Sequence, residues 1–159
     1  MKVYFRSSPR AKKVYDEYIS KIYEIIKSLG YDHTSDFIVS VDTQKFYDAD
    51  NDEIVKYYKS TTTDLKNADI VVLEMSMHSL AVGYLADLAI NLGKPVIALH
   101  TEGNVPYFLQ GIENDKVQII EYSLDNLRRV LEDSLSFEAD VKDTRFNFFI
   151  APKHQHYLD

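Results

Sequence analysis

Four consecutive apolar residues, Ile70-Val71-Val72-Leu73, constrain the fold of this chain more than any other feature. A strand with one face in water alternates apolar and polar side chains, because successive side chains point to opposite faces of the sheet. This run has no alternation, which is typical of a strand covered on both faces, as in parallel sheets flanked by helices. The run therefore predicts a layered α/β fold with a parallel sheet at its centre.

The rest of the chain alternates strand-like and helix-like segments around this run. Apolar residues at steps of three and four from Ala11 to Leu29 predict one face of a helix, which Gly30 ends. Further helices are expected over residues 54–65, 82–92 and 124–135, and further strands over residues 3–5, 37–41, 96–99 and 117–120. This alternation predicts a Rossmann-like (flavodoxin-like), doubly wound, mainly parallel sheet of five strands.

The composition changes after Leu135. Residues 136–144 are polar and acidic and are predicted to be a linker, residues 145–150 are strand-like, and Pro152 could open a short helix. This tail either packs on the same domain or pairs with a second subunit, and both readings stay open. The chain thus divides into an α/β domain, residues 1–135, and a linker with a strand-helix tail, residues 136–159, which could serve as an oligomerisation element.

Charge and composition exclude several classes of partner. The net charge is -7 with acids and bases mixed along the chain, so its long-range field repels the phosphate backbone of nucleic acids. Cysteine is absent and no run of about 18 apolar residues exists for a membrane span. The acidic residues Asp48, Asp50 and Asp52 resemble the start of a calcium loop, but Glu53 stands where that loop needs glycine. We therefore expect a cytoplasmic protein with no metal, no cofactor, and no nucleic-acid or membrane partner.

A turn after the central strand is the first candidate binding element. In doubly wound sheets, ligands bind outside the carboxyl ends of the strands. The amino end of the following helix offers unpaired N–H groups and partial positive charge, so the turn of Ser79, Ala81, Val82 and Gly83 could hold an anion or a sugar oxygen. The absence of a side chain at Gly83 allows close approach of a ligand. The bland alternative is that Ser79 only caps the helix.

The segment from Ala68 to Tyr84, followed by Gly93-Lys94-Pro95, resembles the nucleoside 2-deoxyribosyltransferase superfamily, and within it the 2-deoxynucleoside 5-phosphate N-hydrolase branch. This family places Ala-Asp, an apolar strand and a glutamate before a Ser-Leu-Gly-Val-Gly-Tyr-Glu turn. A weaker likeness extends over residues 3–135. The resemblance implies a small-molecule nucleotide or nucleoside as ligand, and a homodimer or higher homo-oligomer that shares sites between subunits.

The loop after the first strand adds to this resemblance. Its sequence is similar to the phosphate loop Gly-Ser-x-Arg-Gly-Gly of the family at Ser8 and Arg10. The resemblance implies that Arg10 clamps a phosphate through its planar guanidinium and that the Ser8 hydroxyl donates to it. The positions of the three family glycines hold Ser7, Ala11 and Lys12. His33 also has a family counterpart and could touch a base or sugar, although a lone loop histidine is more often structural.

The catalytic positions depart from the family. The family breaks the N-glycosidic bond with a glutamate assisted by an aspartate, and these positions correspond to Leu85 and Thr61 here. Neither side chain can act as a nucleophile or as a carboxylic acid. Asp87 does not replace them, because two residues along a helix rotate a side chain by about 200°. Glu74, at the end of the central strand, remains as a candidate catalytic carboxylate.

Three functions stay open. The first is a nucleotide- or nucleoside-binding protein with degenerate N-glycosidase chemistry. The second is an active deoxyribosyltransferase or nucleotide N-glycoside hydrolase, which would use a displaced carboxylate such as Glu74 or one from a neighbouring subunit. The third is an interaction module without a ligand. The first fits best, because Ser8, Arg10 and Ser79 are kept where Leu85 and Thr61 replace the catalytic acids.

Overall fold

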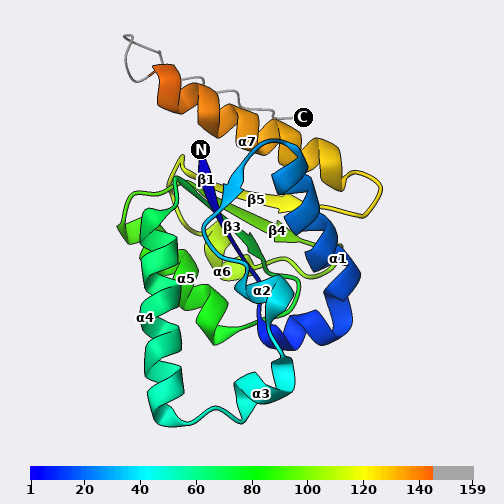
Figure 1. Ribbon diagram of the computed structural model, residues 1–159. Coiled ribbons are helices and arrows are strands. Elements are labelled where there is room, and N and C mark those ends of the chain that lie inside the picture. Colours follow the sequence, from blue (N-terminus) through cyan, green and yellow to red (C-terminus); the bar gives the residue numbers. More distant parts are fainter. Residues whose placement is uncertain (145–159) are drawn as a thin grey trace.

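The computed structural model describes the backbone of residues 1–144 and the side chains of residues 1–136. One sheet of five parallel strands lies between two layers of helices (Figure 1). The strands are β1 (Lys2–Arg6), β2 (Asp32–His33), β3 (Ile70–Glu74), β4 (Val96–His100) and β5 (Val117–Glu121). Their spatial order, β2-β1-β3-β4-β5, is that of flavodoxin-like doubly wound sheets, so the predicted fold class is confirmed.

Helices cover both faces of the sheet. They are α1 (Pro9–Ser28), α2 (Phe37–Ser40), α3 (Thr43–Tyr47), α4 (Asn51–Asn67), α5 (Leu80–Asn91), α6 (Tyr107–Gln110) and α7 (Leu127–Thr144). Val3 and Phe5 of β1 pack with α1 and α7, whereas Tyr4 points to the opposite face and packs with α4 and α5. The four apolar residues of β3 are buried, as their unbroken run predicted, and so is Glu74 at the end of the strand.

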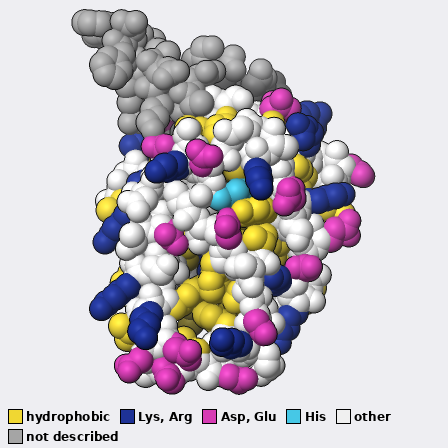
Figure 2. All heavy atoms as spheres, in the orientation of Figure 1, with side chains coloured by type: hydrophobic (Ala, Val, Ile, Leu, Met, Phe, Trp, Pro, Cys, Tyr) yellow, Lys and Arg dark blue, Asp and Glu magenta, His cyan; other side chains and the backbone are white. Residues whose placement is uncertain are grey.

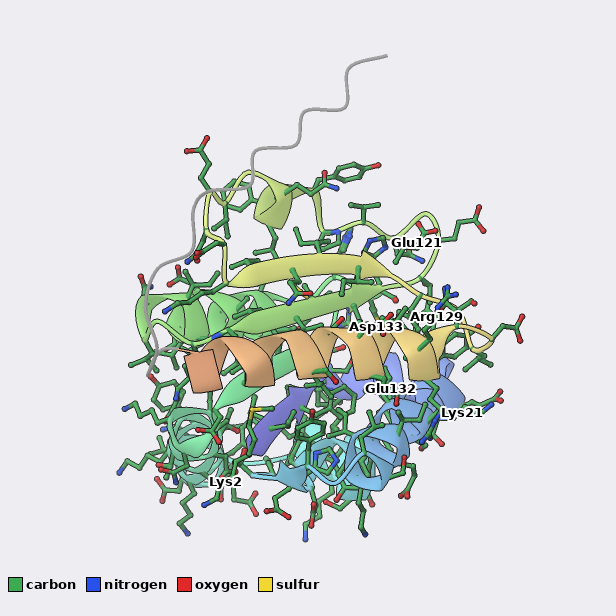
Figure 3. The ribbon with its side chains drawn as sticks, turned by 90° about the horizontal axis from the view of Figure 1, so that it is seen from above. Lys2, Lys21, Glu121, Arg129, Glu132 and Asp133 are labelled. Carbon is green, nitrogen blue, oxygen red and sulfur yellow. The ribbon has the colours of Figure 1, made fainter. Side chains whose placement is uncertain are left out.

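The outer surface of α7 is charged. Seen from above, this helix runs alongside β4 and β5 and carries Arg129, Glu132 and Asp133 on its surface (Figure 3). All three side chains are exposed, while Leu127, Leu131 and Leu135 of the same helix are fully buried. The helix is therefore amphipathic and covers one face of the sheet.

The first helix ends as the sequence predicted. Gly30 has a φ of 87°, a left-handed conformation that costs glycine little and other residues more. The turn returns the chain to the edge of β1, where Asp32 N donates to the carbonyl of Met1 (3.3 Å) and Thr34 N to that of Val3 (3.0 Å). The second strand is therefore only two residues long and begins immediately after the turn.

The strand predicted over residues 37–41 is wrong. Residues Phe37–Ser40 form helix α2, and Asp32–His33 have already taken the place at the sheet edge. The Nζ atom of Lys12 on α1 donates to the carbonyl oxygens of Val39 (2.7 Å) and Val41 (3.2 Å). These contacts hold the end of α2 against α1, so tertiary structure overrides the β preference of Phe-Ile-Val.

The last described helix is longer than expected. It begins at Leu127 rather than at residue 124 and continues to Thr144, so residues 136–144, predicted to be a linker, are helical. A polar composition does not exclude a helix, because the hydrogen bonds of a helix are formed by backbone groups. The strand predicted over residues 145–150 and the helix after Pro152 lie outside the described residues, and the division into residues 1–135 and 136–159 stays a prediction. None of the helices in residues 1–144 is long and apolar enough to span a membrane.

Candidate functional site

Two polar loops meet at the carboxyl edge of the two central strands. Strands β1 and β3 are neighbours, with Arg6 opposite Leu73 in the register. Immediately beyond them, the Ser7 hydroxyl donates a hydrogen bond of 3.1 Å to Oε2 of Glu74. The loop that begins α1 and the loop that begins α5 are therefore tied together at the edge where the sequence placed its candidate residues.

Glu74 is enclosed by the loops that it joins. Its side chain is 1% exposed, and its Oε1 accepts hydrogen bonds from the Ser76 amide (3.0 Å) and the Tyr122 hydroxyl (3.3 Å). Burial, and then the carboxylate of Glu74, raise the pKa of Tyr122, so that hydroxyl stays a donor. Both carboxylate oxygens are engaged, which is the arrangement of a structural hub and leaves no lone carboxylate facing a substrate.

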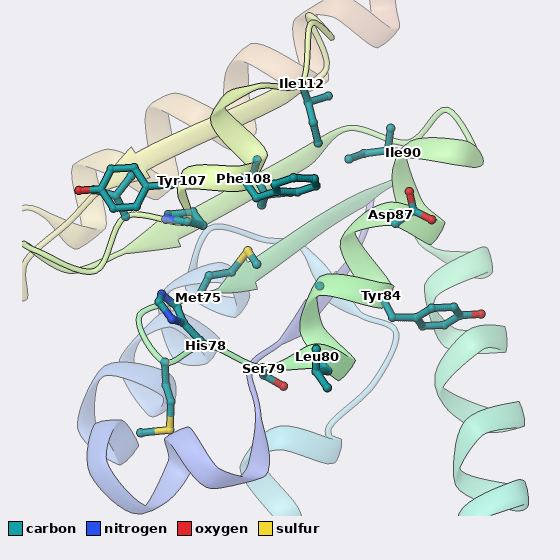
Figure 4. A pocket seen from close by; sticks show the side chains of 15 residues that line it. Met75, His78, Ser79, Leu80, Tyr84, Asp87, Ile90, Tyr107, Phe108 and Ile112 are labelled. Carbon is teal, nitrogen blue, oxygen red and sulfur yellow. The ribbon is translucent and has the colours of Figure 1, made fainter.

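A cavity of about 650 Å³ opens beside the amino end of α5 (Figure 4). That volume lies within the range of small-molecule sites in proteins. Its walls come from the loop after β3, from α5, and from residues 105–112 around α6. Most of the lining is apolar or aromatic, and the side chains with polar groups are those of His78, Ser79, Tyr84, Asp87 and Tyr107. The α6 wall was missed by the sequence analysis, because so short a helix has no periodic pattern.

The predicted binding turn is divided between the cavity, the core and solvent. Ser79 and Gly83 line the cavity, and a Cβ built at Gly83 meets no atom within 4 Å. Val82 is buried and Ala81 is exposed. Ser79 also caps α5, since its hydroxyl accepts from the Val82 amide at 3.4 Å. Ser79 is therefore the cap of α5 and also part of the cavity wall.

Ser8 and Arg10 lie on the neighbouring loop and do not line this cavity. Ser8 is buried and caps α1, accepting from the Ala11 amide at 3.0 Å. Arg10, in the first turn of α1, is exposed. The structure therefore places both residues at the carboxyl edge of the sheet, one as a cap and one as a free surface cation.

His33 is turned toward α1. Its ring stacks on Tyr23 with 3.8 Å between centroids, and its Nε2 lies 2.9 Å from the Tyr23 carbonyl oxygen. Burial lowers its pKa, against the opposing effects of that carbonyl and of nearby carboxylates. Since β2 is separated from β3 by β1, the structure does not bring His33 together with Ser79.

The two positions that correspond to catalytic acids of the family are both buried. Thr61 on α4 is 8% exposed, and Leu85 on α5 is 4% exposed and belongs to the apolar cluster that contains Tyr4. Burial raises the pKa of Tyr4 to about 12, and Thr61 and Asp64 lie in its surroundings. Asp64, one turn beyond Thr61 and half-buried, is a carboxylate that the sequence analysis did not single out, although its spacing from Thr61 places both on one helix face.

Arg6 is the second residue that the sequence analysis missed. It is 4% exposed, and its guanidinium carbon lies 3.8 Å from the ring centroid of Phe37 and 5.2 Å from that of Tyr57. Burial lowers its pKa to about 10. The only sign of Arg6 in the sequence is that a charged residue ends a strand that is otherwise buried. Within the described residues, no cluster of three His, Asp or Glu side chains could hold a metal ion.

No protein-family model matches the sequence, and no curated protein does. The fold, however, matches that of a solved structure, the CMP N-glycosidase BcmB of Clostridium botulinum. The TM-score is 0.61 at 16% sequence identity, and the match covers 83% of this chain and 98% of that chain. The two proteins share a fold. The match covers more than the sheet alone, because most of both chains is included.

Proposed function

We propose that this protein binds nucleoside monophosphates at the carboxyl edge of the sheet and does not cleave their glycosidic bond. The observation that carries the proposal is the cavity beside the amino end of α5, with Ser79 and Gly83 in its wall. The sequence resemblance supports nucleotides as the ligand class. So does the shared fold with an enzyme named for its action on CMP.

Different parts of the cavity wall suit the base and the phosphate of a nucleotide. Tyr84 and Phe108 offer aromatic surface for a base, and His78 and Asp87 offer polar groups for its edge (Figure 4). At the start of α5, the backbone amide of Ala81 suits the phosphate or a sugar hydroxyl, whereas the amides of Val82 and Gly83 already donate to the hydroxyl and the carbonyl oxygen of Ser79. Ser8 and Arg10 remain proposed contacts from the neighbouring elements, whereas His33 would reach a ligand only if its ring left Tyr23.

The same geometry argues against bond cleavage. A positioned general acid or base contributes about a hundred- to ten-thousandfold to a rate, and a nucleophile adds a separate route. Leu85 supplies neither function and Thr61 supplies no carboxylic acid, while both oxygens of Glu74 already accept hydrogen bonds. We therefore expect release of base at a rate near background.

One observation favours a second candidate, an active N-glycosidase or transferase. Asp64 faces the surroundings of Tyr4 from the same helix as Thr61, so it could replace the missing family aspartate. Glu74 could act only if the loops that enclose it opened. Asp64→Asn and Glu74→Gln variants separate these routes, because each removes one ionisable carboxyl and keeps the shape of the side chain.

We also propose that copies of the chain associate through the rim of the cavity. Leu80 and Phe108 are each 95% exposed and Tyr107 is 75% exposed, and all three line the cavity. Contiguous exposed apolar side chains mark interaction surfaces in soluble proteins. A second copy seated there would close the mouth of the site, as expected for a family whose subunits share sites.

The test is binding and turnover on one panel of nucleosides and nucleoside monophosphates. Calorimetry measures binding, and chromatography measures free base. Binding of monophosphates without base release supports the proposal, whereas turnover abolished by Asp64→Asn or Glu74→Gln supports the second candidate. No binding to any member of the panel would refute both and leave a ligand-free interaction module.

Two variants locate the site. Ser79→Asp keeps the helix cap, because aspartate caps as well as serine, but adds a negative charge. It should weaken monophosphate binding by about tenfold or more, equivalent to about 1.4 kcal/mol, and change nucleoside binding less. Gly83→Leu should fill the cavity and abolish binding, whereas Thr63→Leu, exposed on α4 and outside the cavity lining, is its control.

A further inference from the structure

Arg6 is a buried cation without a counterion among the described residues. Its side chain is 4% exposed, and no hydrogen bond or ion pair joins its guanidinium to any residue that the structure describes. The strand directs it to the face covered by α4, where Phe37 and Tyr57 lie against the guanidinium. Aromatic faces attract a cation, but they accept no conventional hydrogen bond from its N–H groups.

Tyr4 presents a second unpaired donor on the same face. The two side chains leave the same side of β1, because residues two apart in a strand do so. The Tyr4 hydroxyl is buried and forms no hydrogen bond of normal geometry, although the Thr61 hydroxyl and the Asp64 carboxylate, both on α4, lie close enough to act on its pKa. Buried charges and hydroxyl groups are ordinarily paired, because leaving them unpaired is costly. Arg6 therefore has aromatic contacts but no acceptor among the described residues, and Tyr4 has only the Thr61 hydroxyl close by.

We infer that Arg6 and Tyr4 form a receptor for a small oxyanion, a phosphate or a carboxylate, between β1 and α4. The planar guanidinium suits two-pronged pairing with either group, and Phe37 and Tyr57 hold its plane in place. The inference goes beyond the proposed nucleotide site, since Arg6 lines neither the cavity beside α5 nor the helix starts. The reduced pKa of Arg6 agrees with it, because an anion would restore the stability of the charged form.

The aromatic clamp lies next to an open part of the surface. Phe37 and Tyr57 also line a hollow of about 220 Å³ among α2, α3 and α4, where hydrophobic side chains gather (Figure 2). The charged residues of this hollow are Asp42, Lys45 and Glu53. Because these charges include both signs, the hollow itself does not select an anion. The guanidinium of Arg6, which lies behind the rings of Phe37 and Tyr57, therefore selects the anion.

Thermal unfolding of the full chain tests the inference. The unfolding midpoint of the wild type should rise by several degrees with sodium phosphate or sodium acetate, compared with sodium chloride at equal ionic strength, because a ligand stabilises the state that binds it. Comparison of phosphate with acetate shows which oxyanion the receptor prefers. Tyr4→Phe should reduce the shift, and Arg6→Lys should reduce it further, because an ammonium lacks the planar fork.

Arg6→Met separates a binding role from a structural one. If Arg6 is the binding site of an anion, Arg6→Met replaces an unpaired buried charge by an apolar side chain. It should then raise the unfolding midpoint in chloride and abolish the rise in midpoint that phosphate or acetate causes. Arg129→Met, on the exposed surface of α7, should leave both unchanged. A lower midpoint for Arg6→Met, together with no oxyanion shift in the wild type, would show that Arg6 only clamps α2 to α4 and would overturn the inference.

A second readout does not depend on stability. The Nε–Hε resonance of Arg6, assigned by its loss in Arg6→Lys, should move as phosphate is titrated. An oxyanion shift that survives in Arg6→Met but disappears in Arg10→Met would place the anion at the nucleotide loop instead and overturn the receptor. Conversely, the protein could bind no nucleotide and still bind phosphate in a way that depends on Arg6. That result would refute the proposed function and support the oxyanion receptor.

Discussion

The hydroxyl of Ser7 donates a 3.1 Å hydrogen bond to the buried carboxylate of Glu74, although 67 residues separate the two along the chain. The same carboxylate accepts from Ser76 and Tyr122, so three loops at one edge of the sheet share a single acceptor. Glu74 thus organises the edge at which the candidate ligand site lies.

Ser7→Ala should lower the free energy of unfolding by about 1–3 kcal/mol, because it removes a buried hydrogen bond to a charged acceptor. Ser60→Ala, on the exposed part of α4, is the matched control and should change it by less than about 0.5 kcal/mol. Urea denaturation followed by circular dichroism measures both. An equal effect of the two substitutions would mean that the Ser7–Glu74 bond contributes nothing to stability.

Restoring both carboxyl groups should restore chemistry. The double variant Leu85→Glu with Thr61→Asp should release base from nucleoside monophosphates at about a hundred- to ten-thousandfold above the background rate. Both side chains enter buried positions, so thermal unfolding must first show that the variant folds. Leu85→Gln with Thr61→Asn, which has the same shape without ionisable groups, should stay inactive. A folded but inactive double variant would show that the substrate does not reach these positions.

His33 should make stability depend on pH. Burial depresses its pKa in the folded state below the ordinary value of 6.5, so the unfolded chain takes up the proton first. This contribution is complete above that ordinary value and is lost as the pH falls through the folded-state pKa. The free energy of unfolding of His33→Phe should therefore fall less than that of the wild type between about pH 7.5 and 5. The same substitution at exposed His78 is the control, and identical slopes for His33→Phe and wild type would contradict the assignment.

Association of the chain should depend on the exposed rim of the cavity. Light scattering should report a dimer or larger assembly for the wild type and a monomer for Leu80→Ser with Phe108→Ser. Both side chains are 95% exposed, so the substitutions should leave the fold of the monomer intact. Leu92→Ser, a half-exposed apolar residue at the other end of α5, serves as control. A monomeric wild type at high concentration would refute the proposed association.

The sequence predicted the centre of the molecule better than its edges. The unbroken run of β3 and the periodic face of α1 follow from burial on two faces and on one face, and burial leaves a direct pattern in sequence. β2 left no such pattern, because Asp32–His33 are held by hydrogen bonds to the edge of β1 rather than by their own preference. The sequence instead predicts the strand at Phe37 and Ile38, because it shows their β propensity and not the contacts of α2.

The residues of the candidate site likewise divide into those that the sequence predicts and those that it does not. Ser79 and Gly83 were predictable, because the start of a helix after a parallel strand must lie at the ligand-binding edge. The direction in which Arg6 points, and the wall that Phe108 adds to the cavity, depend on segments far away in sequence. Sequence periodicity carries no information on such contacts, so these parts of the site appear only in three dimensions.

The pairing of β1 with β3 also sets the order in which the protein can fold during synthesis. Val3 pairs with Ile70, whereas the earlier strand β2 offers β1 only Asp32 and His33 as partners. As the nascent chain leaves the ribosome, α1 therefore emerges with its apolar face uncovered. Any fragment that ends before β3 lacks the centre of the sheet, so the apolar face of α1 stays exposed and can aggregate. Protection by a chaperone therefore matters most while the first half of the chain is being made.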